Sequence, residues 1–266
     1  MELDFASLWK TIKNGSIKDQ KRFWDLRAAE FNSQLASERT VEEAEDVLKY
    51  LKDKGAVDRN HTILDIGCGT GKYALAFARE AKNVTCIDIS AKMIAFAKEN
   101  AQSRGCRNIE LVQASWSEVE LEKRGWMKRF NLVFAAFCPG IDSPEALKKM
   151  IEASRKHCFL SGFVTRQDRV MDGLEAHLGI RENIWGNQIY FCFNLLWQWG
   201  YYPEITYKDR SWTKEYDVEH MADILNARLN GKASREDIIK YLNQISVNGK
   251  VTEVTTSKVA RLYWKV

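Results

Sequence analysis

The run Ile63-Leu64-Asp65-Ile66-Gly67-Cys68-Gly69-Thr70-Gly71 decides the fold of this 266-residue chain. A short apolar strand contains a carboxylate near its end, and three glycines follow at alternate positions. Glycine permits backbone turns and close approaches that a Cβ atom would block. A turn of this kind, leading from a strand into a helix, lets a nucleotide-like ligand lie against bare main chain.

A second apolar strand, Val84-Thr85-Cys86-Ile87, ends in Asp88. A carboxylate at this position can accept hydrogen bonds from the hydroxyl groups of a ribose. The glycine turn and Asp88 together predict an adenosine-type cofactor at the carboxyl ends of parallel strands.

The glycine spacing separates one adenosine cofactor from another. The dinucleotide fingerprint is G-x-G-x-x-G, whereas this chain has G-x-G-x-G with Asp65 two residues before the first glycine. A carboxylate there would repel a diphosphate, but it suits a cofactor with a cationic amino-acid tail. Asp65-x-Gly67-x-Gly69-x-Gly71 resembles the first motif of class I S-adenosylmethionine (SAM) methyltransferases, and Asp88 matches their second-strand acid. A tight turn without a ligand and a dinucleotide site are the alternatives.

The resemblance covers about residues 60–165 and implies a set of cofactor contacts. It places the glycine turn beside the methionine part of SAM, Asp88 on the ribose hydroxyls, and Ile89 and Met93 beside the adenine. Ala114 stands where the family often has an acid for the adenine, so the backbone there is expected to serve instead. The whole cofactor-binding set is Asp65, Gly67, Cys68, Gly69, Gly71, Asp88, Ile89, Met93, Ala114, Ser115, Trp116 and Trp24.

Two aromatic members of this set have an alternative interpretation. Trp116 either covers the adenine or is a core residue. The segment Phe23–Phe31 resembles the aromatic-x-x-x-Ala segment that covers the cofactor in many small-molecule methyltransferases, which implies that Trp24 shields SAM. The alternative is a helix anchored on the flank of the sheet.

Strands alternate with helices along the chain, which indicates right-handed βαβ units and an open parallel sheet. A helix is expected from Pro144 to about Arg155 and another over 188–199. The expected strands cover 63–66, 84–87, 109–112, 130–136 and 159–165, and the family implies an edge hairpin from 205–212 and 259–266.

The predicted fold is therefore α/β: a Rossmann-like, mainly parallel seven-stranded sheet with helices on both faces and an antiparallel edge hairpin. We expect one methyltransferase domain over 1–266, with an N-terminal helical cover (1–58), a SAM-binding core (59–165) and substrate-side helices with edge strands (166–266). Helical insertions at 166–187 and 214–248 form either walls of the site or packing elements, and a homodimer is possible.

Composition limits the partners and the compartment. A formal net charge of +4 is too small to favour nucleic acid. The apolar runs are too short to cross a membrane, and the N-terminus does not resemble a signal peptide. Six scattered cysteines without a Cys-x-x-Cys pair favour reduced thiols in the cytoplasm over disulfides or a metal site.

The sequence does not identify the catalytic residues. SAM carries its own electrophile, so in-line displacement needs neither a metal nor a covalent intermediate. Asp142 is a weak candidate that orients an acceptor or, as we slightly prefer, caps the helix near Pro144. His177 is a second weak candidate, as a base titrating near neutrality, although a lone histidine is more often an ordinary helix residue.

The same loops supply candidate acceptor contacts. The segment Ala135–Gly140 lacks the Asn/Asp-Pro-Pro-Tyr/Phe box of enzymes that methylate base amino groups. Crowded aromatic residues after 184 either bind the acceptor or form core. The acceptor-binding candidates are Cys138, Asp142, Trp185 and Tyr190.

The sequence thus predicts a cytoplasmic enzyme that transfers a methyl group from SAM to a small-molecule acceptor and releases S-adenosylhomocysteine. One alternative is a methyltransferase acting on protein or RNA. The other is a SAM-binding sensor or assembly subunit without catalysis.

Overall fold

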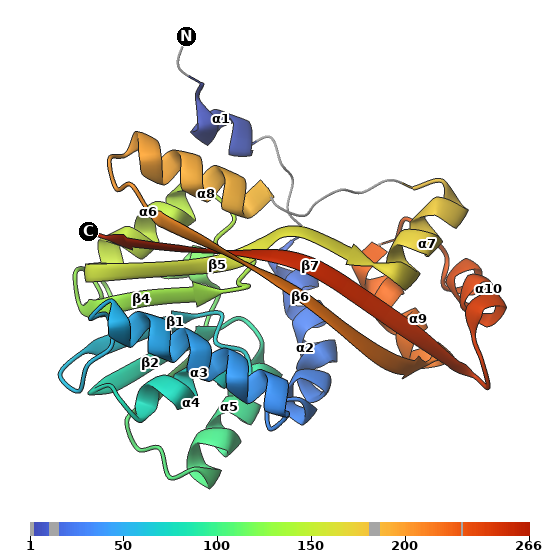
Figure 1. Cartoon of the computed structure of the whole chain (residues 1–266), viewed down its shortest axis with the longest axis horizontal. Coiled ribbons are helices and arrows are strands. Elements are labelled where there is room, and N and C mark those ends of the chain that lie inside the picture. Colours follow the sequence, from blue (N-terminus) through green and yellow to red (C-terminus); the bar gives the residue numbers. More distant parts are fainter. Residues whose placement is uncertain (1–2, 11–15, 181–186, 230) are drawn as a thin grey trace. The chain divides into compact units, whose positions relative to one another are not determined.

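We describe the chain from a computed structural model, in which residues 3–10, 16–180, 187–229 and 231–266 are described. A seven-stranded sheet runs through it in the order β3-β2-β1-β4-β5-β7-β6 (Figure 1). The strands are β1 (Thr62–Ile66), β2 (Asn83–Asp88), β3 (Ile109–Gln113), β4 (Phe130–Ala136), β5 (Ser154–Asp168), β6 (Glu204–Asp217) and β7 (Lys250–Lys265).

Helices connect and cover these strands. They are α1 (Phe5–Lys10), α2 (Ile17–Ser33), α3 (Glu38–Asp53), α4 (Lys72–Ala78), α5 (Ala91–Ser103), the 3₁₀ turn η1 (Trp116–Glu118), α6 (Pro144–Ala153), α7 (Arg169–Leu178), α8 (Asn187–Gln198), α9 (Val218–Leu229) and α10 (Arg235–Ile245). Strand β1 pairs in parallel with β2 and β4, β2 with β3, and β4 with β5. The predicted Rossmann-like, mainly parallel seven-stranded sheet is confirmed.

The contacts divide the chain into two compact units. Unit 1 comprises Met1–Gly162, Gln188–Thr206 and Arg261–Val266, and unit 2 comprises Phe163–Asn187 and Tyr207–Ala260. Unit 1 holds the first four strands and both ends of the described chain. That the whole chain acts as one methyltransferase domain stays a prediction.

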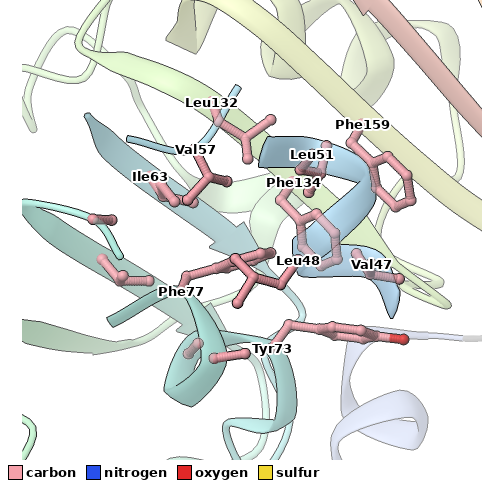
Figure 2. Close-up of a cluster of buried hydrophobic side chains, with 14 of the residues drawn as sticks. Val47, Leu48, Leu51, Val57, Ile63, Tyr73, Phe77, Leu132, Phe134 and Phe159 are labelled. Atoms are coloured by element: carbon pink, nitrogen blue, oxygen red, sulfur yellow. The ribbon is translucent and has the colours of Figure 1, made fainter. Parts of the chain in front are cut away.

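One face of the sheet in unit 1 packs against α3 and α4. Phe134 stacks on Phe159 at 4.9 Å between ring centroids and meets Phe77 edge-on at 5.0 Å. Figure 2 shows this cluster, in which side chains from α3, such as Leu48 and Leu51, lie among the aromatic rings. Close packing of this kind fixes the ends of β1 and β4, from which the site is built.

The opposite face of the same strands packs against α6 and α8. The thiol of Cys158, which alternates with Phe159 along β5, lies 3.9 Å from the carbonyl oxygen of Met150 in α6. A Cβ atom at Gly162 would lie 3.2 Å from Ile189 of α8. Helices therefore cover both faces of the sheet, as predicted.

Unit 2 has a core of its own. Side chains of α7, α9, α10 and the start of β7 form one buried cluster, with Leu174, Ala222 and Leu242 fully buried. In the same unit, the Asp168 carboxylate accepts hydrogen bonds from Arg166 Nε, Arg228 Nη2 (2.9 Å) and Thr255 Oγ1 (2.7 Å). The helical insertion expected at 214–248 is thus present as α9 and α10.

The boundaries of four elements were predicted wrongly. The helix from Pro144 ends at Ala153, not near Arg155, because β5 begins at Ser154 in register with Phe130. Strand β5 is also longer than 159–165, and β6 and β7 are longer than the predicted edge strands. Their extra residues alternate between more and less buried positions but are largely polar, so they lack the apolar run that signals a strand.

In the described part of the chain, none of the helices has the length and apolar character needed to cross a membrane.

Candidate active site

The glycine turn lies where the strand order reverses. From β1 the chain proceeds outward through β2 and β3 and then returns to β4, which lies on the other side of β1. Ile66 of β1 is in register with Ala135 of β4, so the loops after these strands leave the same edge. Open α/β sheets bind ligands in the crevice at such a switch point.

The turn needs glycine for conformation and for space. Gly67, Gly69 and Gly71 have φ angles of +70°, +56° and +94°, in the left-handed region that disfavours other residues. A Cβ atom at Gly67 would lie only 2.5 Å from the Cys138 sulfur in the loop after β4. The backbone of the turn is thereby held against the β4 loop without an intervening side chain.

Asp88 at the end of β2 fixes the two loops of the predicted cofactor site to each other. Its Oδ2 accepts the backbone N–H of Gly69, and its Oδ1 accepts that of Ser90, both at 2.9 Å. Each carboxylate oxygen can accept a further hydrogen bond. Burial raises the pKa of Asp88, and the two backbone donors oppose this rise. The carboxylate remains able to accept hydrogen bonds from ribose hydroxyls.

Asp65 is a buried acid that precedes the glycine turn. It is 2% exposed, and its Oδ2 finds no hydrogen-bond partner among the described residues. Burial, and then the charge of Asp88, raise the pKa of Asp65 to about 8. A cation placed beside this carboxylate would stabilise its ionised form.

The loop after β3 is tied to the same edge. The backbone N–H of Ala114 donates to the carbonyl oxygen of Asp88 at 3.0 Å, and Ser115 Oγ lies 2.8 Å from Ser117 Oγ. Trp116 is buried, and its indole N–H donates to the carbonyl oxygen of Ala146 in α6. These contacts describe Trp116 as a packed side chain, and its contact with adenine stays a prediction.

The remaining cofactor candidates have different surroundings. Met93 is buried, and its sulfur would lie 4.0 Å from a Cβ atom at Gly69, whereas Ile89 is half-buried. Cys68 is buried within the turn. Trp24 is half-buried on α2, edge-on to the rings of Phe23 and Phe31. Its role as a cover of the cofactor also stays a prediction.

The loop after β4 is strained and clamped. Phe137 has a φ of +52°, and its N–H donates to Ser161 of β5 at 2.8 Å. The Gln188 amide from the start of α8 donates to the carbonyl oxygens of Cys138 and Ile141, both at 2.8 Å. Backbone held in a sparsely populated region requires this kind of support. Burial raises the pKa of the Cys138 thiol to about 12, so this thiol is not an activated nucleophile.

The preferred interpretation of Asp142 as a helix cap is wrong. The cap of α6 is Ser143, whose Oγ accepts the N–H of Ala146 at 3.1 Å. Ser143 stands directly before Pro144 and so occupies the position that suits a cap. Asp142 is half-buried one residue earlier, in the loop held by Gln188.

The other acceptor and catalytic candidates are not brought together. Tyr190 of α8 is 55% exposed and meets Phe5 of α1 edge-on at 5.8 Å. His177 belongs to unit 2, where it is exposed and its ring lies 5.4 Å from that of Tyr241. Trp185 lies outside the described residues.

Sequence reasoning missed several polar side chains that support these loops. Gln188 opens an apolar helix, and Asn100 lies on the side of α5 that contacts α2, where its amide reaches the carbonyl oxygen of Thr70 at 3.0 Å. The sequence feature that could have identified Gln188 and Asn100 is a polar residue beside the buried face of a helix. That feature does not say which distant backbone group the side chain will contact.

These features fit SAM on chemical grounds. An uncompensated buried carboxylate at Asp65 suits the ammonium group of an amino-acid tail, and Asp88 offers acceptors for a ribose. The bare backbone at Gly67 leaves no side chain in the turn. Asp65, the glycine turn and Asp88 would therefore hold the cofactor.

Comparisons with known proteins agree with this fit. A family model described as a methyltransferase domain matches residues 63–158, from β1 into β5. A Methanobrevibacter smithii protein named "Probable cobalt-precorrin-6B C(15)-methyltransferase (decarboxylating)" is 40% identical over 65 residues, which are 24% of this chain and 35% of that protein. The 23S rRNA (uracil(1939)-C(5))-methyltransferase RlmD of Shewanella sediminis is 29% identical over 108 residues, 40% of this chain and 24% of that protein.

The similarity to these curated relatives spans about a third or less of their own length. Among solved structures, the [4+2]-cyclase SpnF matches 96% of this chain and 98% of its own at 16% identity, with a TM-score of 0.55. That likeness concerns the fold alone, and a fold can support different reactions. The glycine turn and its acids lie within the segment 63–158 that matches a methyltransferase domain, and this match supports the resemblance to class I SAM-dependent methyltransferases.

Proposed function

We propose that this protein transfers a methyl group from SAM to a small-molecule acceptor and releases S-adenosylhomocysteine. The observation that carries the proposal is the buried, uncompensated Asp65 beside a glycine turn that Asp88 holds in place. Because burial raises the pKa of Asp65 to about 8, the group is largely protonated near neutral pH, and its ionised form requires a nearby cation. An amino-acid ammonium group meets that requirement, and a diphosphate does not.

The chain's own contribution is to bind, orient and exclude water. When bound, SAM supplies a methyl group on a positively charged sulfur. Asp65 and Asp88 hold the two ends of the cofactor's polar part, and the loop after β4 forms the adjoining wall. Gln188 fixes that wall by its two hydrogen bonds. Orientation of two reactants by fixed groups accounts for a large part of catalysis in such reactions.

Asp142 is our candidate for orienting the acceptor. It follows Ile141 in the clamped loop and is half-buried. Because Ser143 caps α6, the Asp142 carboxylate is not needed for that cap. Cys138 and Tyr190 are proposed acceptor contacts, Cys138 through its place in the loop and Tyr190 through its exposed ring on α8.

The test is cofactor binding followed by turnover. The Asp88→Asn variant keeps the side-chain shape but loses the charged acceptor of ribose hydroxyls. We expect the affinity for S-adenosylhomocysteine to fall at least about tenfold by calorimetry, since hydrogen bonds to charged groups contribute about 1.5–3 kcal/mol. An exposed carboxylate on the same unit, changed as Asp58→Asn, is the matched control. Equal affinity in Asp88→Asn and the wild type would reject the cofactor assignment.

Turnover decides among the competing functions. Release of S-adenosylhomocysteine with a panel of small amines, thiols and hydroxyl compounds supports a small-molecule acceptor. The relative that acts on 23S rRNA motivates the macromolecular alternative, which predicts turnover with RNA or protein instead. Binding without turnover on any acceptor class would favour a non-catalytic SAM-binding protein.

The compartment is also a proposal. All six cysteines are free thiols, and five of them are buried. Thiols of this kind persist in a reducing compartment, so we propose a cytoplasmic location.

A further inference from the structure

Helix α2 meets α5 along one face. Asp25, Ala28 and Asn32 follow one another at intervals of three and four residues and so share a side of α2. Ala28 is fully buried in the centre of this face, and its small side chain allows the helices to approach closely. Asp25 Oδ1 accepts the hydroxyl of Ser90 at 2.5 Å and lies 3.4 Å from the N–H of Lys92, at the start of α5.

Ser90 links this face to the acid at the end of β2. Its N–H donates to Asp88 Oδ1, while its Oγ accepts the N–H of Met93 at 3.1 Å as the cap of α5. The hydroxyl proton is then directed to Asp25. Ser90 is fully buried, and its bonds to Asp88 and Met93 are shielded from water, while its bond to Asp25 is partly buried.

Asn100 makes the corresponding link to the glycine turn. Its Nδ2 donates to Asn32 Oδ1 at 2.8 Å and to the carbonyl oxygen of Thr70 at 3.0 Å. Thr70 stands between the last two glycines of the turn. Each cofactor loop is therefore joined to α2 through one side chain, Ser90 at the N-cap of α5 or Asn100 within α5, that also contacts the loop itself.

We propose that Asp25 and Asn32 are positioning residues, through which the docking of α2 orders the Asp88 loop and the glycine turn. Cofactor binding and α2 docking then reinforce each other, because a coupling between two sites is reciprocal. The identity of the ligand rests on the proposed function, but the coupling itself rests on Ser90 and Asn100.

The first test is the affinity of the folded full chain for S-adenosylhomocysteine. The double variant Asp25→Ala/Asn32→Ala removes both acceptors, and we expect the affinity to fall about tenfold or more, at roughly fivefold per hydrogen bond. In the conservative double variant Asp25→Asn/Asn32→Asp, acceptors remain, and the affinity stays within about twofold of wild type. Ser33→Ala is the matched control, because the Ser33 hydroxyl donates to Glu30 within α2.

A second readout separates coupling from simple loss of packing. In the wild type, S-adenosylhomocysteine slows hydrogen exchange both at the glycine turn and along α2. In the double alanine variant the protection of the turn persists while that of α2 disappears. Undiminished affinity together with undiminished protection of α2 would overturn the proposal.

Hydrogen exchange measured without ligand distinguishes failure of this proposal from failure of the proposed function. We expect exchange of the Gly69 and Ser90 amides to be about fivefold faster in the double alanine variant than in the wild type or in Ser33→Ala. Unchanged exchange at both amides overturns the coupling, whatever the ligand. If exchange accelerates but the wild type does not bind S-adenosylhomocysteine, the cofactor assignment fails and the coupling stands. The single variants Asp25→Ala and Asn32→Ala carry the same test if the double variant does not fold.

Discussion

A Cβ atom at Gly67 would lie 2.5 Å from the sulfur of Cys138 and 3.0 Å from its Cβ atom. These residues follow β1 and β4, so their contact joins the loops on either side of the switch point. We expect Gly67→Ala to lower the free energy of unfolding by about 2 kcal/mol or more, since both the overlap and the left-handed backbone oppose a side chain. Urea unfolding measures the change.

The second residue of the pair provides the check. The Cys138→Gly substitution removes the obstructing atoms, so the double variant Gly67→Ala/Cys138→Gly should be more stable than the two single effects predict. We expect a coupling of at least about 1 kcal/mol, the size found for residues in contact. Strict additivity would mean that the steric contact does not decide the identity of residue 67.

Asp65 should make the unliganded protein sensitive to alkaline pH. Its pKa is about 8 in the folded chain and about 3.9 in an unfolded one, so folding favours the protonated form. The stability that this group supplies is complete below pH 4 and is lost as the pH rises towards 8. We expect the melting temperature of Asp65→Asn, relative to wild type, to rise by about 4 °C or more between pH 5 and pH 8. A difference that stays constant with pH would contradict the assignment.

The same carboxyl group should report the charge of the ligand. A cationic tail beside Asp65 stabilises its ionised form, so binding of S-adenosylhomocysteine at pH 6.5 should release close to one proton. Calorimetry in buffers of different ionisation enthalpy measures this number. In Asp65→Asn the release should vanish, and its persistence would place the titrating group elsewhere.

Gln188 should stabilise the loop after β4 without changing the affinity for the cofactor. Gln188→Ala removes donors to Cys138 and Ile141, and the strained loop that begins at Phe137 loses its clamp. We expect faster hydrogen exchange over 137–142 and a free energy of unfolding lower by about 1–3 kcal/mol. The affinity for S-adenosylhomocysteine should stay within about twofold. Asn194→Ala, whose amide donates to Tyr190 within α8, is the control, and equal exchange in both variants would remove Gln188 from this role.

His157 should make the fold sensitive to acid. It is 1% exposed, its Nδ1 lies 2.8 Å from the Tyr263 hydroxyl, and burial lowers its pKa to about 4. The stability linked to a neutral His157 is present above about pH 6.5 and is lost as the pH falls towards 4. The stability advantage of wild type over His157→Gln should therefore shrink by at least about 1 kcal/mol between pH 7 and pH 4.5. Exposed His177 provides the control His177→Gln, and an equal change in both variants would refute the prediction.

Local features of the sequence were predictable to a large extent. Apolar runs located the first five strands, and Ser90 is the cap of α5 because a serine before a helix satisfies an unpaired N–H. The predictions failed where the chain is polar, as in the long parts of β6 and β7, or where two caps compete, as at Asp142 and Ser143. In the second case the hydrogen bond to Ala146, and not residue type, decides between them.

The sequence by itself determined the glycine turn, the acids before and after it and the alternation of strands with helices, because backbone conformation and short-range periodicity depend on neighbouring residues. Only the tertiary structure decided that Gly67 meets Cys138, that Gln188 clamps the β4 loop and that Asp25 reaches Ser90. These contacts join segments far apart in the chain. They depend on how packed helices and strands fill space, which no local pattern records.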